Sequence, residues 1–176
     1  MSARRILRGA VVGALASLPA SYVKAVTEPP LQRAAERLLP PESWQKRLVG
    51  ADPSGRPENM PPAVVASEVD ELRGGAGLDA EQKIRASRTI HYAFGVVVGA
   101  AYGAKAEWLP WVTRGAGAPA GLALYGITHA TALPALGIQE SPWDLPRSAV
   151  VWESASHVVF GVSLELSRRV VDRLLP

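Results

Sequence analysis

The sequence contains no cysteine. This absence excludes disulfide bonds, zinc sites with thiolate ligands and catalysis by a thiol nucleophile. The chain also has no glycine-rich phosphate loop, no G-x-S-x-G nucleophile motif and no H-E-x-x-H zinc motif. We therefore expect a protein that is not an enzyme and that binds no cofactor.

A basic patch interleaved with aromatic side chains is also missing, although the net charge is +3. Arginines instead flank the apolar runs near both ends of the chain: Arg4, Arg5, Arg8, Arg168, Arg169 and Arg173. This arrangement is typical of membrane anchoring rather than of nucleic-acid binding. We expect the lipid bilayer as a partner and no nucleic acid, while a protein partner or a homo-oligomer stays open.

Four apolar stretches are long enough to cross a bilayer, at about 6–26, 89–106, 115–138 and 148–167. A helix of about 20 residues spans the hydrocarbon layer of ~30 Å. The stretch 115–138 is the strongest evidence, because it carries no formal charge. The pattern predicts an all-α fold, an integral membrane four-helix bundle that forms a single membrane domain over residues 1–176.

Glycines spaced by four residues predict close packing of these helices. The expected packing positions are Gly95, Gly99, Gly103, Gly121 and Gly161. In the second stretch they form two overlapping G-x-x-x-G patterns, which favour a close helix crossing.

Residues 27–88 form a long polar connection punctuated by Pro29-Pro30, Pro40-Pro41 and Pro61-Pro62. Short amphipathic helices are predicted within it, one over 31–39 and another from about Ser67 to Gly74. Asp79 is the predicted N-cap of the helix that enters the second span. The connection either covers the end of the bundle or binds a partner.

Residues 1–26 have a second interpretation. An arginine-rich start, a short apolar region and a Val-Lys-Ala sequence also suit a cleaved secretory signal peptide. A retained first span is the preferred interpretation. With four spans both termini lie on one side, and the flanking arginines place that side in the cytoplasm.

The fourth stretch carries ionisable residues at a regular spacing. Glu153, His157, Gly161 and Glu165 are each four residues apart. On a helix they form one stripe, and an ionisable group at membrane depth is costly unless it faces protein or water. We therefore expect this stripe to point into the bundle.

A buried polar cluster is predicted from four residues in three spans: His91, His129, Glu153 and His157. Counted from one membrane face, they fall within roughly 12 Å of depth. Three interpretations stay open. The groups hydrogen-bond one another and fix the helix register, or they conduct protons or ions, or Glu153, His157 and His129 bind a metal such as zinc or iron.

An ordered set of residues resembles a known family. The set comprises Val23-Lys24, Glu28-Pro29-Pro30, Ile90-His91, Gly99, Tyr102, Glu107, Pro110, Gly121, His129, Pro134, Gly137, Asp144-Leu145-Pro146, Glu153, His157, Glu165 and Arg168-Arg169. In these residues the chain resembles the YagU-like family of bacterial inner-membrane proteins, whose function is unassigned. The resemblance implies a multi-pass inner-membrane bundle, but it supplies no reaction, cofactor or catalytic residue.

The functional prediction follows from these observations. We expect an integral inner-membrane protein whose buried Glu/His cluster handles protons or ions. The alternative is a structural or scaffolding subunit that binds a partner through residues 27–88, and a metal-binding membrane protein is the third interpretation.

Overall fold

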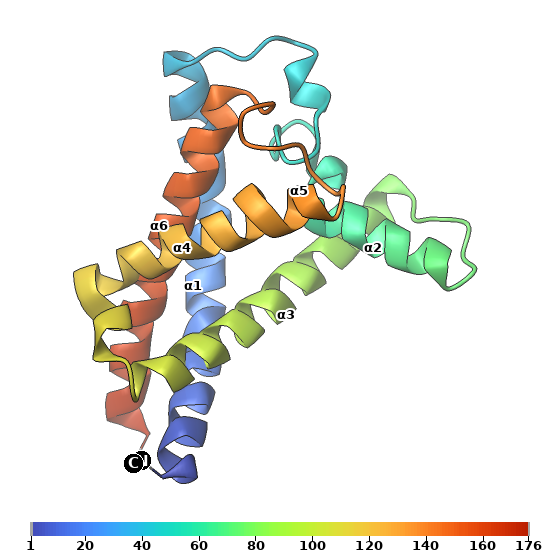
Figure 1. The fold of residues 1–176 in the computed structure, drawn as a ribbon. Coiled ribbons are helices and arrows are strands. Elements are labelled where there is room, and N and C mark those ends of the chain that lie inside the picture. The colour runs from blue at the N-terminus through green and yellow to red at the C-terminus, as the bar shows by residue number, and fades with distance from the viewer. Residues whose placement is uncertain (1, 176) are drawn as a thin grey trace. The chain divides into compact units, whose positions relative to one another are not determined.

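The structure, a computed structural model, describes residues 2–175 and is built from helices (Figure 1). The α-helices are α1 (Ala3–Leu38), α2 (Pro61–Leu72), α3 (Ala80–Ala106), α4 (Ala118–Ile127), α5 (Leu133–Ala135) and α6 (Arg147–Leu174). Four shorter elements lie between them: η1 (Gln45–Arg47), η2 (Pro57–Asn59), η3 (Pro110–Gly117) and η4 (Thr128–Ala132). Residues 2–175 contain no strand, which confirms the all-α prediction.

α1 is the one helix within residues 2–175 that is both long enough and apolar enough to cross a membrane. The other predicted spans differ from it for local reasons. α6 carries Glu153, His157 and Glu165 in its apolar stretch, and α4 ends after ten residues. The four-crossing bundle therefore stays a prediction.

The residue contacts divide the chain into two compact units. Unit 1 comprises Met1–Thr27, Tyr92–Leu124 and Ala155–Pro176, and unit 2 comprises Glu28–His91 and Tyr125–Ser154. Every boundary between them falls inside one of the helices α1, α3, α4 and α6. Each unit has its own apolar cluster, described below, and the single-domain prediction stays untested.

In unit 1, α1 and α3 meet through glycines. Gly13 of α1 faces the backbone of Gly99 and Gly103 of α3, so closely that a methyl group on any of them would meet the other backbone. α6 contacts the α4 region in the same way, with Gly161 against Gly117 and Gly121. Four of the predicted packing glycines, Gly99, Gly103, Gly121 and Gly161, thus lie where two helix backbones touch, whereas Gly95 faces the Ser21 side chain.

The apolar cluster of unit 1 fills the space beside these crossings. Its buried members are Ala16, Ala20, Tyr102, Phe160 and Leu164. The first turns of α1 and the last turns of α6 lie side by side (Figure 1), because Arg8 Nη1 donates to Asp172 Oδ1 at 2.6 Å. Arg8 also donates to the backbone carbonyls of Asp172 and Leu175.

In unit 2, α1 runs on where we predicted the start of a polar loop. The helix passes through Pro29-Pro30 and ends at Leu38, so the segment 31–39 is its last part and no separate helix. A proline inside a helix costs about 3 kcal/mol. Tertiary packing offsets this cost, because Leu31 and Ala35 pack against Ala149 and Trp152 of α6.

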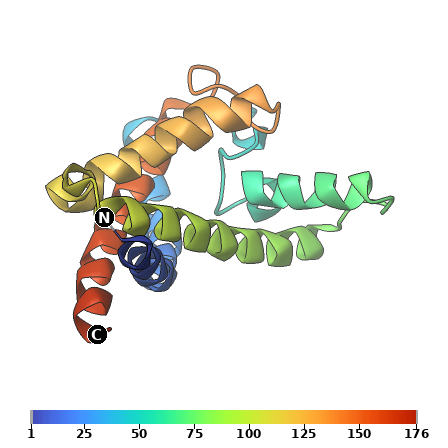
Figure 2. The ribbon, with the colours of Figure 1, turned by 60° about the horizontal axis from the view of Figure 1, so that its bottom comes forward.

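The start of α3 follows the sequence prediction. The Asp79 carboxylate accepts the Gln82 backbone N–H at 2.8 Å, and the Gln82 side chain accepts the Asp79 N–H at 2.9 Å, a reciprocal capping box. α2 lies alongside the first half of α3 (Figures 1 and 2). It begins at Pro61 rather than near Ser67, because proline suits the first helical position.

The stretch 115–138 is not one regular helix. Gly115, Ala116 and Gly117 have positive φ, which interrupts the helical backbone at the end of η3, before α4 begins. A π-helical turn, η4, follows α4, and Thr131 Oγ1 donates to the carbonyl of Gly126, five residues earlier. Pro134 lies in the last short piece, α5, so the prediction that it kinks or ends this helix is confirmed.

Candidate functional site

The ionisable stripe of α6 is buried, as predicted. Glu153 is 2% exposed, His157 4% and Glu165 0%, and Gly161 is buried beside them. The surface of the same helix carries apolar side chains instead, among them Val151, Leu166 and Val170. α6 therefore turns its ionisable stripe toward protein, together with Trp152, Phe160 and Leu164, while Val151, Leu166 and Val170 lie outside.

In unit 2, His129 and Glu153 form a direct contact. His129 Nδ1 lies 2.9 Å from Glu153 Oε1 and 2.9 Å from Gln139 Oε1. Gln139 is itself buried, and its Nε2 donates to Glu153 Oε2 at 3.5 Å. The Tyr125 ring stacks on the imidazole, with ring centroids 5.9 Å apart.

This geometry determines where the imidazole carries its hydrogen. Both oxygens near Nδ1 are acceptors, so Nδ1 is the protonated nitrogen. Nε2 is then an acceptor in the neutral ring and a second donor in the charged ring. The His129 side chain is 14% exposed while that of Glu153 is 2% exposed, so the imidazole is the outer member of the pair.

His129 is held in place by the π-helical turn η4. Such turns place one extra residue in a helix and often occur at functional sites. Gln139 approaches from the turn after α5. Gly50, in the loop between η1 and η2, has a φ of +83° and leaves room for the Gln139 amide. The sequence prediction missed Gln139, because a single glutamine in a polar turn gives no periodic signal.

The other members of the predicted cluster are placed as follows. His91 is half-buried and belongs to unit 2, at the boundary inside α3. His157 is buried and belongs to unit 1. Within residues 2–175, no three His, Asp or Glu side chains come together as a metal-binding group.

A second buried carboxylate organises unit 1. Glu165 accepts hydrogen bonds from Arg168 Nε at 2.8 Å, from Arg169 Nε at 2.7 Å and from the Tyr102 hydroxyl at 3.0 Å. The two arginines follow Glu165 by three and four residues, which is the spacing of side-chain pairs on a helix. These contacts compensate the burial of the charge.

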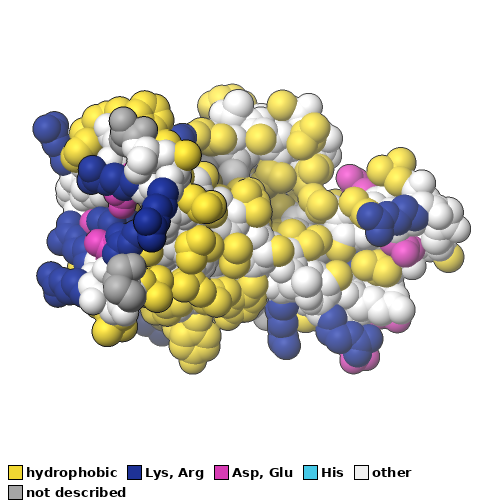
Figure 3. Space-filling view, turned by 90° about the horizontal axis from the view of Figure 1, so that it is seen from below, with side chains coloured by type: hydrophobic (Ala, Val, Ile, Leu, Met, Phe, Trp, Pro, Cys, Tyr) yellow, Lys and Arg dark blue, Asp and Glu magenta, His cyan; other side chains and the backbone are white. Residues whose placement is uncertain are grey.

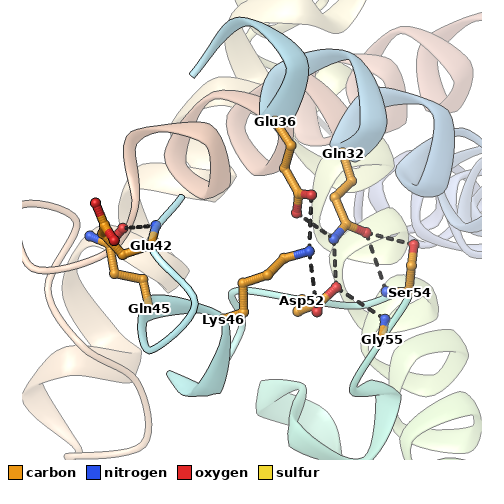
Figure 4. Close-up of polar contacts among 8 residues, drawn as sticks. All are labelled: Gln32, Glu36, Glu42, Gln45, Lys46, Asp52, Ser54 and Gly55. Atoms are coloured by element: carbon orange, nitrogen blue, oxygen red, sulfur yellow. Dashed lines mark hydrogen bonds and ion pairs between the residues drawn. The ribbon is translucent and has the colours of Figure 1, made fainter. Parts of the chain in front are cut away.

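A third polar cluster lies in unit 2 and joins the last part of α1 to the loop after η1 (Figure 4). The buried Gln32 amide donates to Asp52 Oδ1 at 2.7 Å and to Glu36 Oε1 at 2.8 Å, and its oxygen accepts Ser54 Oγ at 2.6 Å. These side chains line an open pocket of about 340 Å³, together with Arg33, Lys46 and Gly55. The sequence prediction did not include this cluster.

Lys46 links the two carboxylates of that cluster. Its Nζ donates to Glu36 Oε2 at 3.0 Å and lies 3.5 Å from Asp52 Oδ2 (Figure 4). The hydrogen bond to Glu36 raises the pKa of Lys46 above its ordinary value of 10.5, aided by the charge of Asp52. The folded protein therefore holds this proton more tightly than the unfolded chain does.

This raised pKa predicts a pH dependence of stability. The contribution of Lys46 is fully present below pH 10.5, its unfolded value, and disappears as the pH rises through the higher folded value. We expect Lys46→Met to be less stable than the parent at pH 8, with a difference that shrinks above pH 10.5. Unfolding of both proteins followed between pH 8 and pH 12 measures it, and a difference that stays constant would contradict the role of the charge.

The comparison with known families matches residues 18–166 to a model described as "Protein of unknown function (DUF1440)". This match covers most of the chain. The chain belongs to the DUF1440 family. The predicted resemblance to YagU-like proteins is consistent with this family and is confirmed. His129, Glu153, Gln139 and Glu165 all lie in the matched region of this DUF1440 member. Searches of curated proteins and of solved structures found no match.

Proposed function

We propose that this DUF1440 member is an integral protein of the bacterial inner membrane with four crossings, formed by α1, α3, the segment 115–138 and α6. The distribution of side chains supports this proposal, because large apolar groups lie outside while ionisable groups lie inside. Exposed apolar side chains occur along all four, including Leu7, Val11, Leu15, Leu18, Tyr22, Phe94, Val97, Leu122, Ile127, Leu136, Val151, Leu166 and Val170. In water such surfaces are rare, whereas lipid favours them.

The first crossing is a retained span in this proposal. Gly9 and Gly13 of α1 contact the backbone of α3, so this segment takes part in the packing of unit 1. The basic residues at the start of α1 and the end of α6 favour a cytoplasmic location for both termini.

Within this membrane protein we propose that His129 and Glu153 bind and release a proton. The observation that carries the proposal is the contact of His129 Nδ1 with Glu153 Oε1 at 2.9 Å. The buried carboxylate contacts Nδ1 and orients the ring, and the imidazole is the more exposed group of the pair, through which we propose that the proton enters and leaves. No cofactor and no covalent chemistry are needed for such a step.

Proton flux into liposomes that contain the purified protein tests this function. Glu153→Gln removes the carboxylate that contacts Nδ1 of His129, so we expect at least a tenfold loss of flux, and His129→Gln should have the same effect. Glu140→Gln, an exposed carboxylate one residue from Gln139, is the matched control and should keep the parental flux.

Two outcomes would contradict proton handling. The first is a parent protein with no flux above that of empty liposomes. The second is a folded Glu153→Gln variant that conducts as the parent does. Either result would favour the scaffolding function, in which the same buried pair only fixes the helix register.

A further inference from the structure

The ends of α1, α3 and α6 in unit 1 form one basic surface. Arg5 Nε donates to Glu107 Oε2 at 2.7 Å, which joins the start of α1 to the end of α3. Arg8 and Asp172 join the start of α1 to the end of α6. These two ion pairs show that the three helix ends lie at the same end of unit 1.

Basic side chains outnumber acidic ones on this surface. The basic rim is the name we give to the basic members at these helix ends together with Arg114 of η3, the element that follows α3: Arg4, Arg5, Arg8, Lys105, Arg114, Arg168, Arg169 and Arg173. The acidic members are Glu107, Asp172 and the buried Glu165. The pairs described above use all three carboxylates, and Figure 3 shows the remaining excess of Lys and Arg side chains around the chain ends.

The side chains of four members of the basic rim have no ion pair or hydrogen bond among residues 2–175. They are Arg4, Lys105, Arg114 and Arg173, and all four are exposed. Because their charges are not neutralised within the part of the chain that the structure describes, they attract an anionic partner.

Two tryptophans lie between these cations. Trp108 and Trp111 are 51% and 60% exposed, and they occupy the turn between Lys105 and Arg114. Indole rings favour the interface between lipid headgroups and hydrocarbon. Their exposure beside unpaired cations is typical of a surface that sits at headgroup level.

The surface next to the basic rim is apolar. Leu7 and Val11 on α1 and Leu166, Val170 and Leu174 on α6 are all exposed there. Figure 3 shows hydrophobic side chains directly beside the Lys and Arg side chains of this end. An acyl chain fits the apolar surface and an anionic headgroup fits the basic rim, so one amphiphilic molecule can bind to both.

We propose that the basic rim binds the headgroups of anionic phospholipids, with Arg4, Lys105, Arg114 and Arg173 as phosphate-binding cations and Trp108 and Trp111 as interfacial anchors. This inference rests on the proposed membrane function, since it needs the apolar surface of unit 1 to lie in the bilayer. It goes further by assigning a preferred class of lipid to one end of the protein.

Quenching of tryptophan fluorescence by brominated lipid tests the preference. The full chain is reconstituted in phosphatidylcholine bilayers with rising fractions of either brominated phosphatidylglycerol or brominated phosphatidylcholine. We expect the anionic lipid to associate about threefold to tenfold more strongly, and 0.5 M salt to reduce this ratio. The variant R4Q/K105Q/R114Q/R173Q should bring the ratio close to one.

The matched control removes four exposed cations from unit 2 instead. R33Q/R37Q/R47Q/R56Q changes the net charge by the same amount and should keep the parental preference. Equal quenching by both lipids in the parent would overturn the proposal. So would a control variant that loses the preference for the anionic lipid as fully as the basic-rim variant does. A chain that alkaline carbonate releases from membranes would contradict the membrane function as well, whereas an inserted chain without preference contradicts the basic rim alone.

Discussion

Replacing Gly99 by leucine is expected to lower the free energy of unfolding by about 3 kcal/mol or more, the upper range for overpacking a tight contact. A β-carbon on Gly99 would lie 2.6 Å from Ser17 Cβ and would also meet the carbonyl oxygen of Gly13. Backbone atoms of α1 cannot rotate away as a flexible side chain does. The two helices must therefore separate, which removes the close contacts that stabilise small-residue crossings.

Unfolding of the purified protein by heat or by sodium dodecyl sulfate in detergent micelles measures this effect. Gly126→Leu is the control, because a β-carbon on Gly126 has no neighbour within 4 Å and a helix favours leucine over glycine. If Gly99→Leu were as stable as Gly126→Leu, the crossing of α1 and α3 would not depend on close backbone approach.

Removal of the buried Glu165 carboxylate is expected to have an effect of similar size. Glu165→Ala leaves Arg168 and Arg169 without their shared acceptor and Tyr102 without its hydrogen-bond partner. Breaking a buried pair from one side costs about 3–5 kcal/mol, and the half-exposed Arg169 places the expected loss at about 3 kcal/mol. Glu165→Gln keeps an acceptor for Tyr102 and should lose less.

The same unfolding measurement compares this loss with that of an exposed pair. Glu81→Ala breaks the contact of Glu81 with Arg85 at 2.7 Å, where both side chains are well exposed, and should cost less than about 1 kcal/mol. Equal losses for Glu165→Ala and Glu81→Ala would show that burial of Glu165 does not determine its contribution.

Features that depend on residues close together in the chain were correctly predicted. The N-cap at Asp79 needs only the backbone N–H of Gln82, three residues later. The burial of Glu153, His157 and Glu165 follows from their spacing of four on one helix face. Both features are local consequences of helix geometry, so they can be read without tertiary information.

Features that were mispredicted or missed depend on distant residues. Pro29-Pro30 indicated the end of a helix, but packing of Leu31 and Ala35 on Trp152 carries α1 on to Leu38. The absence of charge over 115–138 indicated one span, yet it contained no information on the positive φ values at 115–117 or on the π-helical turn. Hydropathy reports solvent preference and leaves backbone continuity undetermined.

The sequence by itself determined the helical class, the inward stripe of α6 and the candidates His129 and Glu153, because period and polarity are local properties. Only the tertiary structure decided which acceptors surround the imidazole and which hydroxyl donates to Glu165. Gln139 reaches His129 across 10 residues, Gln32 reaches Asp52 across 20, and Tyr102 reaches Glu165 across 63. Such partners are selected by the folded path of the backbone, and no periodic pattern in the chain encodes them.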